Sequence, residues 1–268
     1  MPQFFPRWTN TLPLKIVICL VLLGTGVTAA VWITFTPKYT RVGYQPGQPV
    51  PYSHRIHVGE LGMDCRYCHS FAETSSHSNV PTAETCMNCH RQVKAQSPNL
   101  APVREAYATG KPVEWVRVHK SPDYVYFNHS VHLNRGISCQ DCHGRVDEME
   151  VVHQAEPHSM GWCLECHRNP SKKLRPLGEV VNFDYDPASL EREAFYGDLM
   201  AEGHDAPELI AALERANGLA PSGSGDFGSL MTLAEKTFGE TMKQEEVGQQ
   251  LQSAWGIHPP EHCSACHR

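Results

Sequence analysis

The sequence predicts a mainly helical and irregular chain with few strands, made of one N-terminal transmembrane helix and one large domain outside the membrane. Residues 16–37 form an uncharged and mostly apolar run, and about 20 helical residues are enough to cross a bilayer. The segments 190–217 and 230–255 carry apolar residues at helical spacing, whereas the alternation typical of strands is weak. Short helices and irregular segments are therefore expected to make up the large domain.

The composition excludes several classes of protein. The 268 residues carry a net charge of −6, so nucleic-acid binding, which needs a basic face, is not expected. Charged residues are 19% and apolar residues 41% of the chain, which excludes a charge-rich disordered protein. The unusual values are 11 Cys and 16 His, a density typical of a chain that binds a metal, or a metal-bearing cofactor, several times.

Ten of the eleven cysteines belong to one repeated motif, Cys-x-x-Cys-His, which is the attachment signature of a c-type haem. The two thiols bond to the vinyl groups on one edge of the porphyrin, and the adjacent His ligates the iron. We therefore expect five covalently attached haems and five proximal ligands. The motif residues are Cys65, Cys68 and His69; Cys86, Cys89 and His90; Cys139, Cys142 and His143; Cys163, Cys166 and His167; and Cys263, Cys266 and His267.

Three other interpretations of these cysteines fit less well. Disulfides would not require a His after every second Cys. Zinc sites use Cys-x-x-Cys in pairs, whereas five copies are an odd number. A thioredoxin-like redox motif occurs once, in a βαβ setting. The eleventh cysteine, Cys19, lies in the apolar run and is expected to be an inert thiol that faces the membrane.

Positive charges set the orientation of the apolar run. Lys15 and Lys38 bracket it and Arg7 precedes it, which predicts that residues 1–15 are cytoplasmic. The haem domain then lies on the periplasmic side, where c-type haem attachment takes place. A cleaved signal peptide is the alternative, but the run is longer than the 7–15 apolar residues usual for a signal. We therefore expect a retained single-pass anchor at 16–37 in the inner, cytoplasmic membrane.

The chain after the anchor is organised around an internal repeat. A linker rich in Pro and Gly spans 38–51, and the domain of 52–268 follows. The first copy of the repeat has Tyr52, His54 and His57, with Gly62 three residues before a motif; the second has Phe127, His129 and His132, with Gly136 in the same place. We divide the domain into two two-haem modules at 52–110 and 111–177, a helical insert at 178–257 and the fifth motif at 258–268.

The remaining histidines are candidates for the distal iron positions. His54 and His57, like His129 and His132, are three residues apart and share one side of a helical turn, so each pair can ligate two haems. His119 is preferred as the fifth distal ligand. The alternatives are His153, His158, His258, His262, Met149 and Met160. This surplus of ligands predicts six-coordinate irons, so we expect no substrate site in this chain.

The arrangement of an aromatic residue, a His-x-x-His pair and a following motif resembles the small multihaem cytochromes of the class III type. That resemblance implies that His54 ligates the iron held by His69 and that His129 ligates the iron held by His143. It also implies that His57 and His132 reach neighbouring haems.

A closer resemblance rests on residues 112–119, 125–132 and 160–168, together with the motif count and the anchor. These look like the membrane-anchored pentahaem subunit of alternative complex III, a bacterial quinol:electron-acceptor oxidoreductase of respiratory chains. The resemblance covers roughly 10–182 and the C-terminal motif. It implies an iron–sulfur subunit and polytopic quinol-binding subunits as partners, and a monohaem cytochrome c, another small carrier or an oxidase as acceptor.

Two functions follow as hypotheses. The first is an electron-relay subunit of such a complex. The alternative is an autonomous membrane-anchored quinol dehydrogenase that feeds a periplasmic reductase; a pentahaem reductase with an open iron position is a third possibility. The residues alone leave open the haem potentials, the order of the haems, the role of the insert and the final acceptor.

Overall fold

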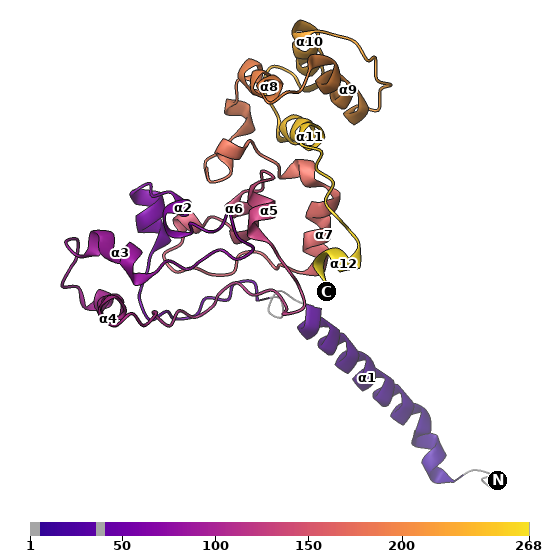
Figure 1. Cartoon of the computed structure of the whole chain (residues 1–268). Coiled ribbons are helices and arrows are strands. Elements are labelled where there is room, and N and C mark those ends of the chain that lie inside the picture. The colour runs from indigo at the N-terminus through magenta and orange to yellow at the C-terminus, as the bar shows by residue number, and fades with distance from the viewer. Residues whose placement is uncertain (1–5, 36–40, 268) are drawn as a thin grey trace.

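The computed structural model describes residues 6–35 and 41–267 (Figure 1). Within these residues the chain forms helices and irregular segments and no strand, with two isolated β-bridges, Val125 to His267 and Ile137 to Leu174. The predicted secondary structure is confirmed: a mostly helical domain preceded by one long apolar helix.

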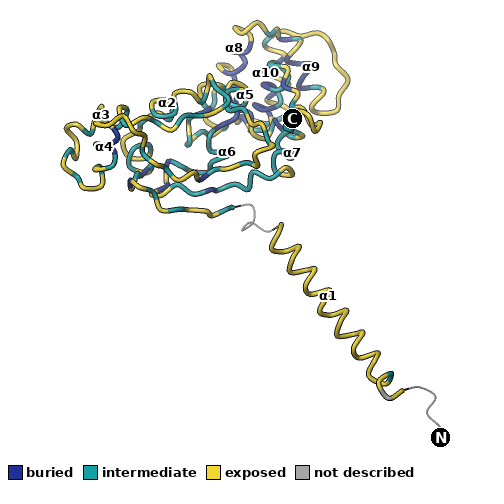
Figure 2. The backbone as a smooth tube through the Cα atoms, turned by 60° about the horizontal axis from the view of Figure 1, so that its bottom comes forward, coloured by how far each residue is buried: buried dark blue, intermediate teal, exposed yellow. Residues whose placement is uncertain are grey.

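The N-terminal helix has the character of a membrane anchor. The 3-10 turn η1 (Arg7–Thr11) leads into α1 (Leu12–Phe35), which has no buried residue and is exposed along its whole length (Figure 2). Of the helices in the described residues, this is the one long and apolar enough to cross a membrane. It begins four residues before the predicted start at Ile16, and the predicted end at Pro37 lies outside the described residues.

Short helices carry the five motifs. They are α2 (Cys65–Cys68), α3 (Ala83–His90), α6 (Cys139–His143), α7 (Met160–Arg168) and α12 (Cys263–Cys266). The other elements of this part are the π-helix η2 (Arg55–Glu60), α4 (Ala101–Thr109), α5 (His129–Leu133), and the 3-10 turns η3 (Pro98–Leu100), η4 (Val146–Glu148), η5 (Pro170–Lys172), η6 (Leu177–Glu179) and η7 (Pro187–Ser189).

Side-chain caps fix where several of these helices begin. Asp64 accepts a hydrogen bond from Arg66 N at the start of α2, Asn128 accepts one from Val131 N at α5, and Ser159 accepts one from Trp162 N at α7. Each cap satisfies an N–H group that has no partner within its helix. The caps therefore set the positions of motif 1, the His129–His132 pair and motif 4.

The motif-bearing part buries little apolar surface of its own. Its buried apolar cluster consists of Val50, Met87 and Val103. Large apolar side chains beside the motifs stay open, for example Leu61 at 66% and Phe71 at 57% exposure. Exposed apolar surface on this scale marks a place where another group binds.

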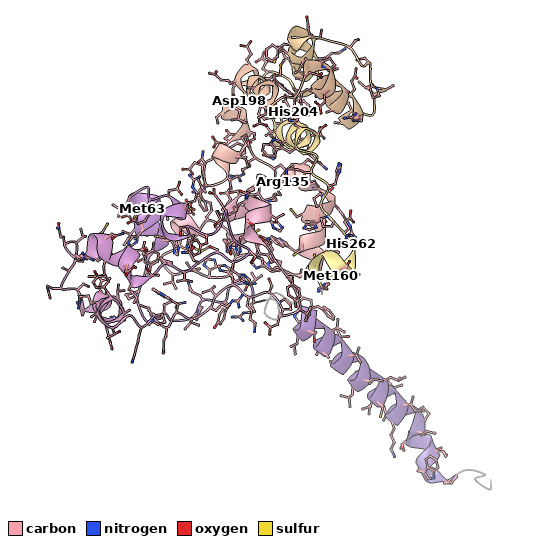
Figure 3. All side chains as sticks on the ribbon, viewed as in Figure 1. Met63, Arg135, Met160, Asp198, His204 and His262 are labelled. Atoms are coloured by element: carbon pink, nitrogen blue, oxygen red, sulfur yellow. The ribbon has the colours of Figure 1, made fainter. Side chains whose placement is uncertain are left out.

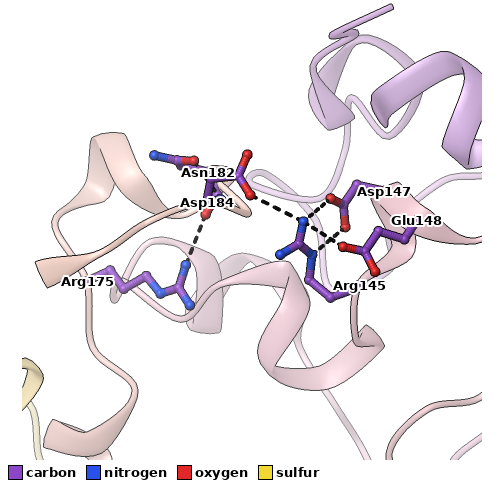
Figure 4. Close-up of polar contacts among 6 residues, drawn as sticks. All are labelled: Arg145, Asp147, Glu148, Arg175, Asn182 and Asp184. Carbon is purple, nitrogen blue, oxygen red and sulfur yellow. Dashed lines mark hydrogen bonds and ion pairs between the residues drawn. The ribbon is translucent and has the colours of Figure 1, made fainter. Parts of the chain in front are cut away.

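Polar contacts hold the irregular segments of this part together. Arg145, which follows the third motif, forms ion pairs with Asp147, Glu148 and Asp184 (Figure 4). Arg175 donates a hydrogen bond of 3.0 Å to the main-chain oxygen of Asn182. These contacts tie the chain after the third motif to the chain after the fourth.

The insert forms a helical lobe with a core of its own. The lobe contains α8 (Arg192–Ala201), α9 (Ala206–Ala216), α10 (Phe227–Phe238) and α11 (Gln244–Ala254). Each of the two predicted helical segments is in fact two helices. The breaks fall at Gly203 (φ +106°) and Gly239 (φ +85°), positive φ values that favour glycine. Its fully buried apolar side chains include Leu209, Leu213, Leu230, Val247 and Leu251.

An ion pair lies inside this lobe. The Arg192 guanidinium contacts the buried Glu246 carboxylate, and Tyr196 Oη donates to Glu246 Oε1 at 3.1 Å. Burial raises the pKa of Glu246, while the arginine opposes that shift. Removing one partner of such a pair would leave a buried group without its counter-charge.

The lobe is attached to the motif-bearing part through α11 and η5. Gln244 Nε2 donates to the main-chain oxygens of Ser171 at 3.2 Å and Leu174 at 2.7 Å. Gly248 faces the same turn so closely that an added Cβ would lie 1.7 Å from Ser171 O. The helix can therefore approach η5 only because this position has no side chain.

We predict that Gly248→Ala separates the lobe from η5. The methyl group would collide with backbone, and overpacking of this kind costs about 1–3 kcal/mol. Thermal unfolding should begin at a lower temperature, and limited proteolysis should cut between η5 and the lobe. Gly197→Ala in α8 is the matched control, because an added Cβ there meets nothing within 4 Å. Equal melting temperatures for both variants would contradict this account of the contact.

Candidate haem-binding site

Each motif presents its two thiols on one side of a helical turn. The cysteines are three residues apart, which places them on one helix face, and the His follows directly. All ten motif cysteines are free thiols. This is the state that covalent attachment to vinyl groups requires.

Four of the five motif histidines each make the same kind of hydrogen bond. Their Nδ1 atoms lie within hydrogen-bond distance of main-chain oxygens: His69 with Asn79 O at 2.7 Å, His90 with Val93 O at 2.9 Å, His167 with Pro260 O at 2.7 Å and His267 with Tyr124 O at 3.2 Å. A carbonyl can only accept, so Nδ1 carries the proton and Nε2 keeps its lone pair for a metal.

The predicted distal histidines show the same pattern. His57, His129 and His132 place Nδ1 at 2.8, 3.1 and 2.7 Å from the main-chain oxygens of Ser53, Ser76 and Asn128. His119 is hydrogen-bonded to the backbone of His153, and its Nε2 is buried without a partner among the described residues. His54 differs, because its buried Nδ1 is the atom without such a partner.

Most of the other histidines are bonded differently. His158 directs Nε2, the atom a ligand would need, to Cys142 O at 2.9 Å. His77 and His262 place Nδ1 beside Ser76 Oγ and Ser264 Oγ at 2.9 and 3.1 Å, and His204 lies 3.4 Å from Glu208 Oε2. A contact between Nδ1 and a main-chain oxygen therefore distinguishes seven of the predicted ligands from these histidines.

The internal repeat has the same geometry in both copies. The Tyr52 ring centre lies 4.8 Å from that of His54 and 4.5 Å from that of His57, and Phe127 has the same two distances to His129 and His132. Gly62 and Gly136 both have positive φ, +64° and +76°. The aromatic ring thus fixes the orientation of each histidine pair.

Three distal rings face proximal rings across similar gaps. The ring centres are 6.1 Å apart for His57 and His90, 6.2 Å for His132 and His167, and 6.4 Å for His129 and His143. Two imidazoles on opposite sides of one metal, each about 2 Å from it through nitrogen, have ring centres about 6 Å apart. The described residues contain no group of three side chains that could hold a metal. The pairs therefore fit a metal whose other ligands come from a cofactor.

The remaining two distal candidates lie beside the first and third motifs. His54 is close enough to His69 for the positive charge of one to disfavour that of the other. The His119 ring centre is 4.4 Å from that of His143, with the rings nearly perpendicular. The ring contact of His267 is with Tyr124, at 5.5 Å. The assignment of His119 to the fifth haem thus stays a prediction.

The other candidates for the fifth haem lie in different environments. Met160, 68% exposed, starts α7, and His262 directly precedes α12; Figure 3 shows both at this end of the domain. Met149 is buried, and His258 is exposed. Met160 and His262 therefore lie at the same end of the domain.

Burial keeps the predicted ligands in the form that binds metal. Desolvation lowers the pKa of His54 and of His119 to about 4, and it lowers the pKa of His129 and His132 as well. His143 is affected most, with a pKa well below its usual value. Neutral imidazole is the ligating form, so these sites are ready to bind a metal at neutral pH.

Comparison with known proteins agrees with this geometry. Residues 50–108 and 125–186 match the family model described as cytochrome c7 and related cytochrome c, and each segment contains two of the motifs. These two segments are therefore similar to multihaem cytochrome domains of the cytochrome c7 type.

A relative of known role gives a second comparison. The protein described as "Menaquinone reductase, multiheme cytochrome c subunit" from Nitratidesulfovibrio vulgaris is 38% identical to this chain over 100 residues. The match covers 37% of this chain and 47% of the relative, so it spans about half the length of that protein. This chain is thus similar to a subunit of a quinone-linked complex.

The residues present fit covalently bound haem. The free thiols, the neutral imidazoles, the buried Nε2 of His119 and the exposed apolar side chains each meet one requirement of the cofactor. When bound, the haem iron accepts and gives up single electrons. The motif cysteines would hold the cofactor covalently, and the histidines would ligate its iron.

We predict that His57→Ala leaves every haem attached but makes one of them high-spin. Attachment needs only the motifs, whereas His57 is the imidazole that faces His90. Haem count by mass spectrometry and electron paramagnetic resonance of the oxidised protein measure the two effects. His77→Ala is the control, because His77 bonds to a serine side chain instead. An unchanged low-spin spectrum in His57→Ala would remove His57 from the ligand set.

Proposed function

We propose that this chain is an electron-transfer subunit that carries five covalently attached c-type haems and relays electrons from a quinol-oxidising membrane complex to a periplasmic acceptor. The observation that carries the proposal is the pairing of imidazoles with ring centres 6.1–6.4 Å apart at three of the motifs. A ligand on each side of an iron leaves no position for a substrate. Electron transfer without substrate chemistry is the function that such closed sites support.

The proposed sites are the five motifs with ten axial histidines. His69, His90, His143, His167 and His267 are the proximal ligands. Five more are distal: His54, His57, His119, His129 and His132. The pairing of His57 with His90 and of His132 with His167 is supported by the ring distances. The distance of 6.4 Å between His129 and His143 supports the assignment from class III cytochromes, in which His54 then serves His69.

The anchor is α1, in the inner membrane, with residues 1–15 in the cytoplasm and the haem domain in the periplasm. The absence of any buried residue in α1 supports contact with lipid along its length. Lys15 and Arg7 support the orientation. A single-pass anchor without packed neighbours is also free to contact the helices of other membrane subunits.

The partners are an iron–sulfur subunit and polytopic quinol-binding subunits, with a monohaem cytochrome c, another small carrier or an oxidase as acceptor. The resemblance to the pentahaem subunit of alternative complex III supports this set. The name of the Nitratidesulfovibrio relative, a menaquinone reductase subunit, supports a quinone-linked complex but describes electron flow toward the quinone. A relay of this kind can serve either direction, because the partners' potentials decide it.

Affinity capture of the full-length chain from native membranes in mild detergent tests the proposal. We expect polytopic subunits and an iron–sulfur protein to be recovered with it, and the recovered assembly to oxidise quinol when an acceptor is supplied. The reverse reaction, reduction of a quinone by a reduced carrier, is measured in the same preparation. Mass spectrometry counts the haems on the chain.

The other outcomes each contradict a different part of the proposal. If the chain is recovered alone and still oxidises quinol, it has its own quinol site and is an autonomous quinol dehydrogenase. If the assembly only reduces quinone, the direction proposed is wrong. A count other than five haems would contradict the proposed cofactor content. The same assay on preparations from cells that express the His57→Ala variant is the control. Quinol oxidation that is unchanged in those preparations does not pass through this chain.

A further inference from the structure

The contacts between the motifs do not follow their order in the sequence. We number the motifs 1 to 5 by their first cysteines, which are Cys65, Cys86, Cys139, Cys163 and Cys263. In Figure 1 the helices that carry them lie from left to right as α3, α2, α6, α7 and α12. Figure 2 gives the same order for α3, α2, α6 and α7 from another direction. Motif 2 is therefore at one end of the row, outside motif 1.

Motif 2 contacts motif 1 through residues inside both motifs. Asn88 Nδ2, between the two cysteines of motif 2, donates a hydrogen bond of 3.0 Å to the hydroxyl of Tyr67, between the cysteines of motif 1.

Motif 1 contacts motif 3 directly. The Cys65 thiol lies beside the Cys139 thiol. Backbone contacts on both sides support the junction: His129 N donates to Ser76 O at 3.1 Å, and Arg55 N donates to Met149 O at 3.0 Å. Each module thus places its His-x-x-His segment against the chain that follows the first motif of the other module.

Motif 4 lies on the far side of motif 3. Lys173, just after α7, forms an ion pair of 3.0 Å with Asp141 inside motif 3. His158 bridges the same two motifs, with Nε2 at 2.9 Å from Cys142 O and its ring centre 5.3 Å from that of Trp162. The ion pairs of Arg145 add to this junction.

Motif 5 extends the row beyond motif 4. His167 Nδ1 lies 2.7 Å from Pro260 O, and Arg168 forms an ion pair of 3.0 Å with Glu261. These two contacts hold the chain just before motif 5 against the end of α7.

We infer that the five attachment sites form one unbranched series in the order 2–1–3–4–5, with motifs 2 and 5 at its ends and the contact between motifs 1 and 3 joining the two modules. This inference rests on the proposed haem content. Haems held by neighbouring motifs exchange electrons directly, so an electron that enters at motif 2 passes motif 1 before it reaches motif 4. In the order of the sequence, motif 1 would instead lie outside that path.

Site-directed injection of electrons into the full-length protein tests this order. Two labelled variants, Ser70→Cys and Gln92→Cys, place a ruthenium photoreductant one residue after motif 1 and two residues after motif 2; both positions are exposed. Cys19→Ser removes the other free cysteine. His132→Ala makes haem 4 high-spin and therefore distinguishable by its absorption. The excited ruthenium complex gives one electron to a ferric haem, and a sacrificial donor restores the complex.

We expect the electron to reach the marked haem 4 sooner from the label after motif 1 than from the label after motif 2, by threefold or more. The opposite ranking would overturn the inferred order and support the order of the sequence. Both labelled variants keep all five attachment motifs, so the loss of a haem does not affect the comparison of their arrival times. Mass spectrometry of the same samples counts the haems. A count other than five would contradict the proposed haem content, whereas the arrival times test the order.

Removal of single attachment sites provides a second measurement. With the label after motif 2, Cys65→Ala with Cys68→Ala should slow arrival at haem 4 at least tenfold, because haem 1 lies on the path. Cys263→Ala with Cys266→Ala is the matched control and should leave arrival unchanged, because haem 5 lies beyond haem 4. If loss of haem 1 has no effect while the other four haems remain attached, the series 2–1–3–4–5 is wrong.

Discussion

The site depends on a hydrogen bond that recurs at the ligand histidines, between ring Nδ1 and a main-chain oxygen. It fixes the tautomer and leaves the lone pair of Nε2 available for a metal. Several of the oxygens come from distant parts of the chain: Tyr124 O is 143 residues from His267, and Pro260 O is 93 residues from His167. The axial geometry of one motif is therefore set by the backbone around another. A shift in any one segment would change the ligation of a haem elsewhere in the row.

Two different kinds of core follow from this design. The motif-bearing part has a small apolar cluster around Val50, Met87 and Val103, and its other apolar side chains line positions that a porphyrin would cover. The helical lobe buries its own apolar residues in the usual way and contains no motif. With haem bound as proposed, folding of the first part would be coupled to cofactor attachment, whereas the lobe is stabilised by side-chain packing. Gly248, in close contact with η5, is the position at which the helical lobe is attached to the motif-bearing part.

The sequence was sufficient for the parts of the site that depend on local spacing. The five motifs, the repeated His-x-x-His pairs and the apolar run are readable because their residues lie within a few positions of one another. The sequence favoured His119 over His158 only by its position before the second repeat, whereas their tertiary hydrogen bonds distinguish the two. The residues whose main-chain oxygens accept the ring hydrogen bonds cannot be recognised in the sequence, because every residue has a main-chain oxygen. The insert was predicted as two helical segments rather than four helices, since the effect of Gly203 and Gly239 depends on their φ values.

Reciprocal packing of the two modules explains why a duplicated sequence gives a row of sites. The segment around Arg55 lies on the chain after motif 3, and the segment around His129 lies on the chain after motif 1. Because each module makes the equivalent contact with the other, the two modules pack together through the same face of each. Motifs 1 and 3 then meet at the centre, and motifs 2 and 4 are left outside. One outer position, motif 4, is covered by motif 5, so the row is extended at that end only. The two ends therefore differ in their surroundings, as a relay between two different partners requires.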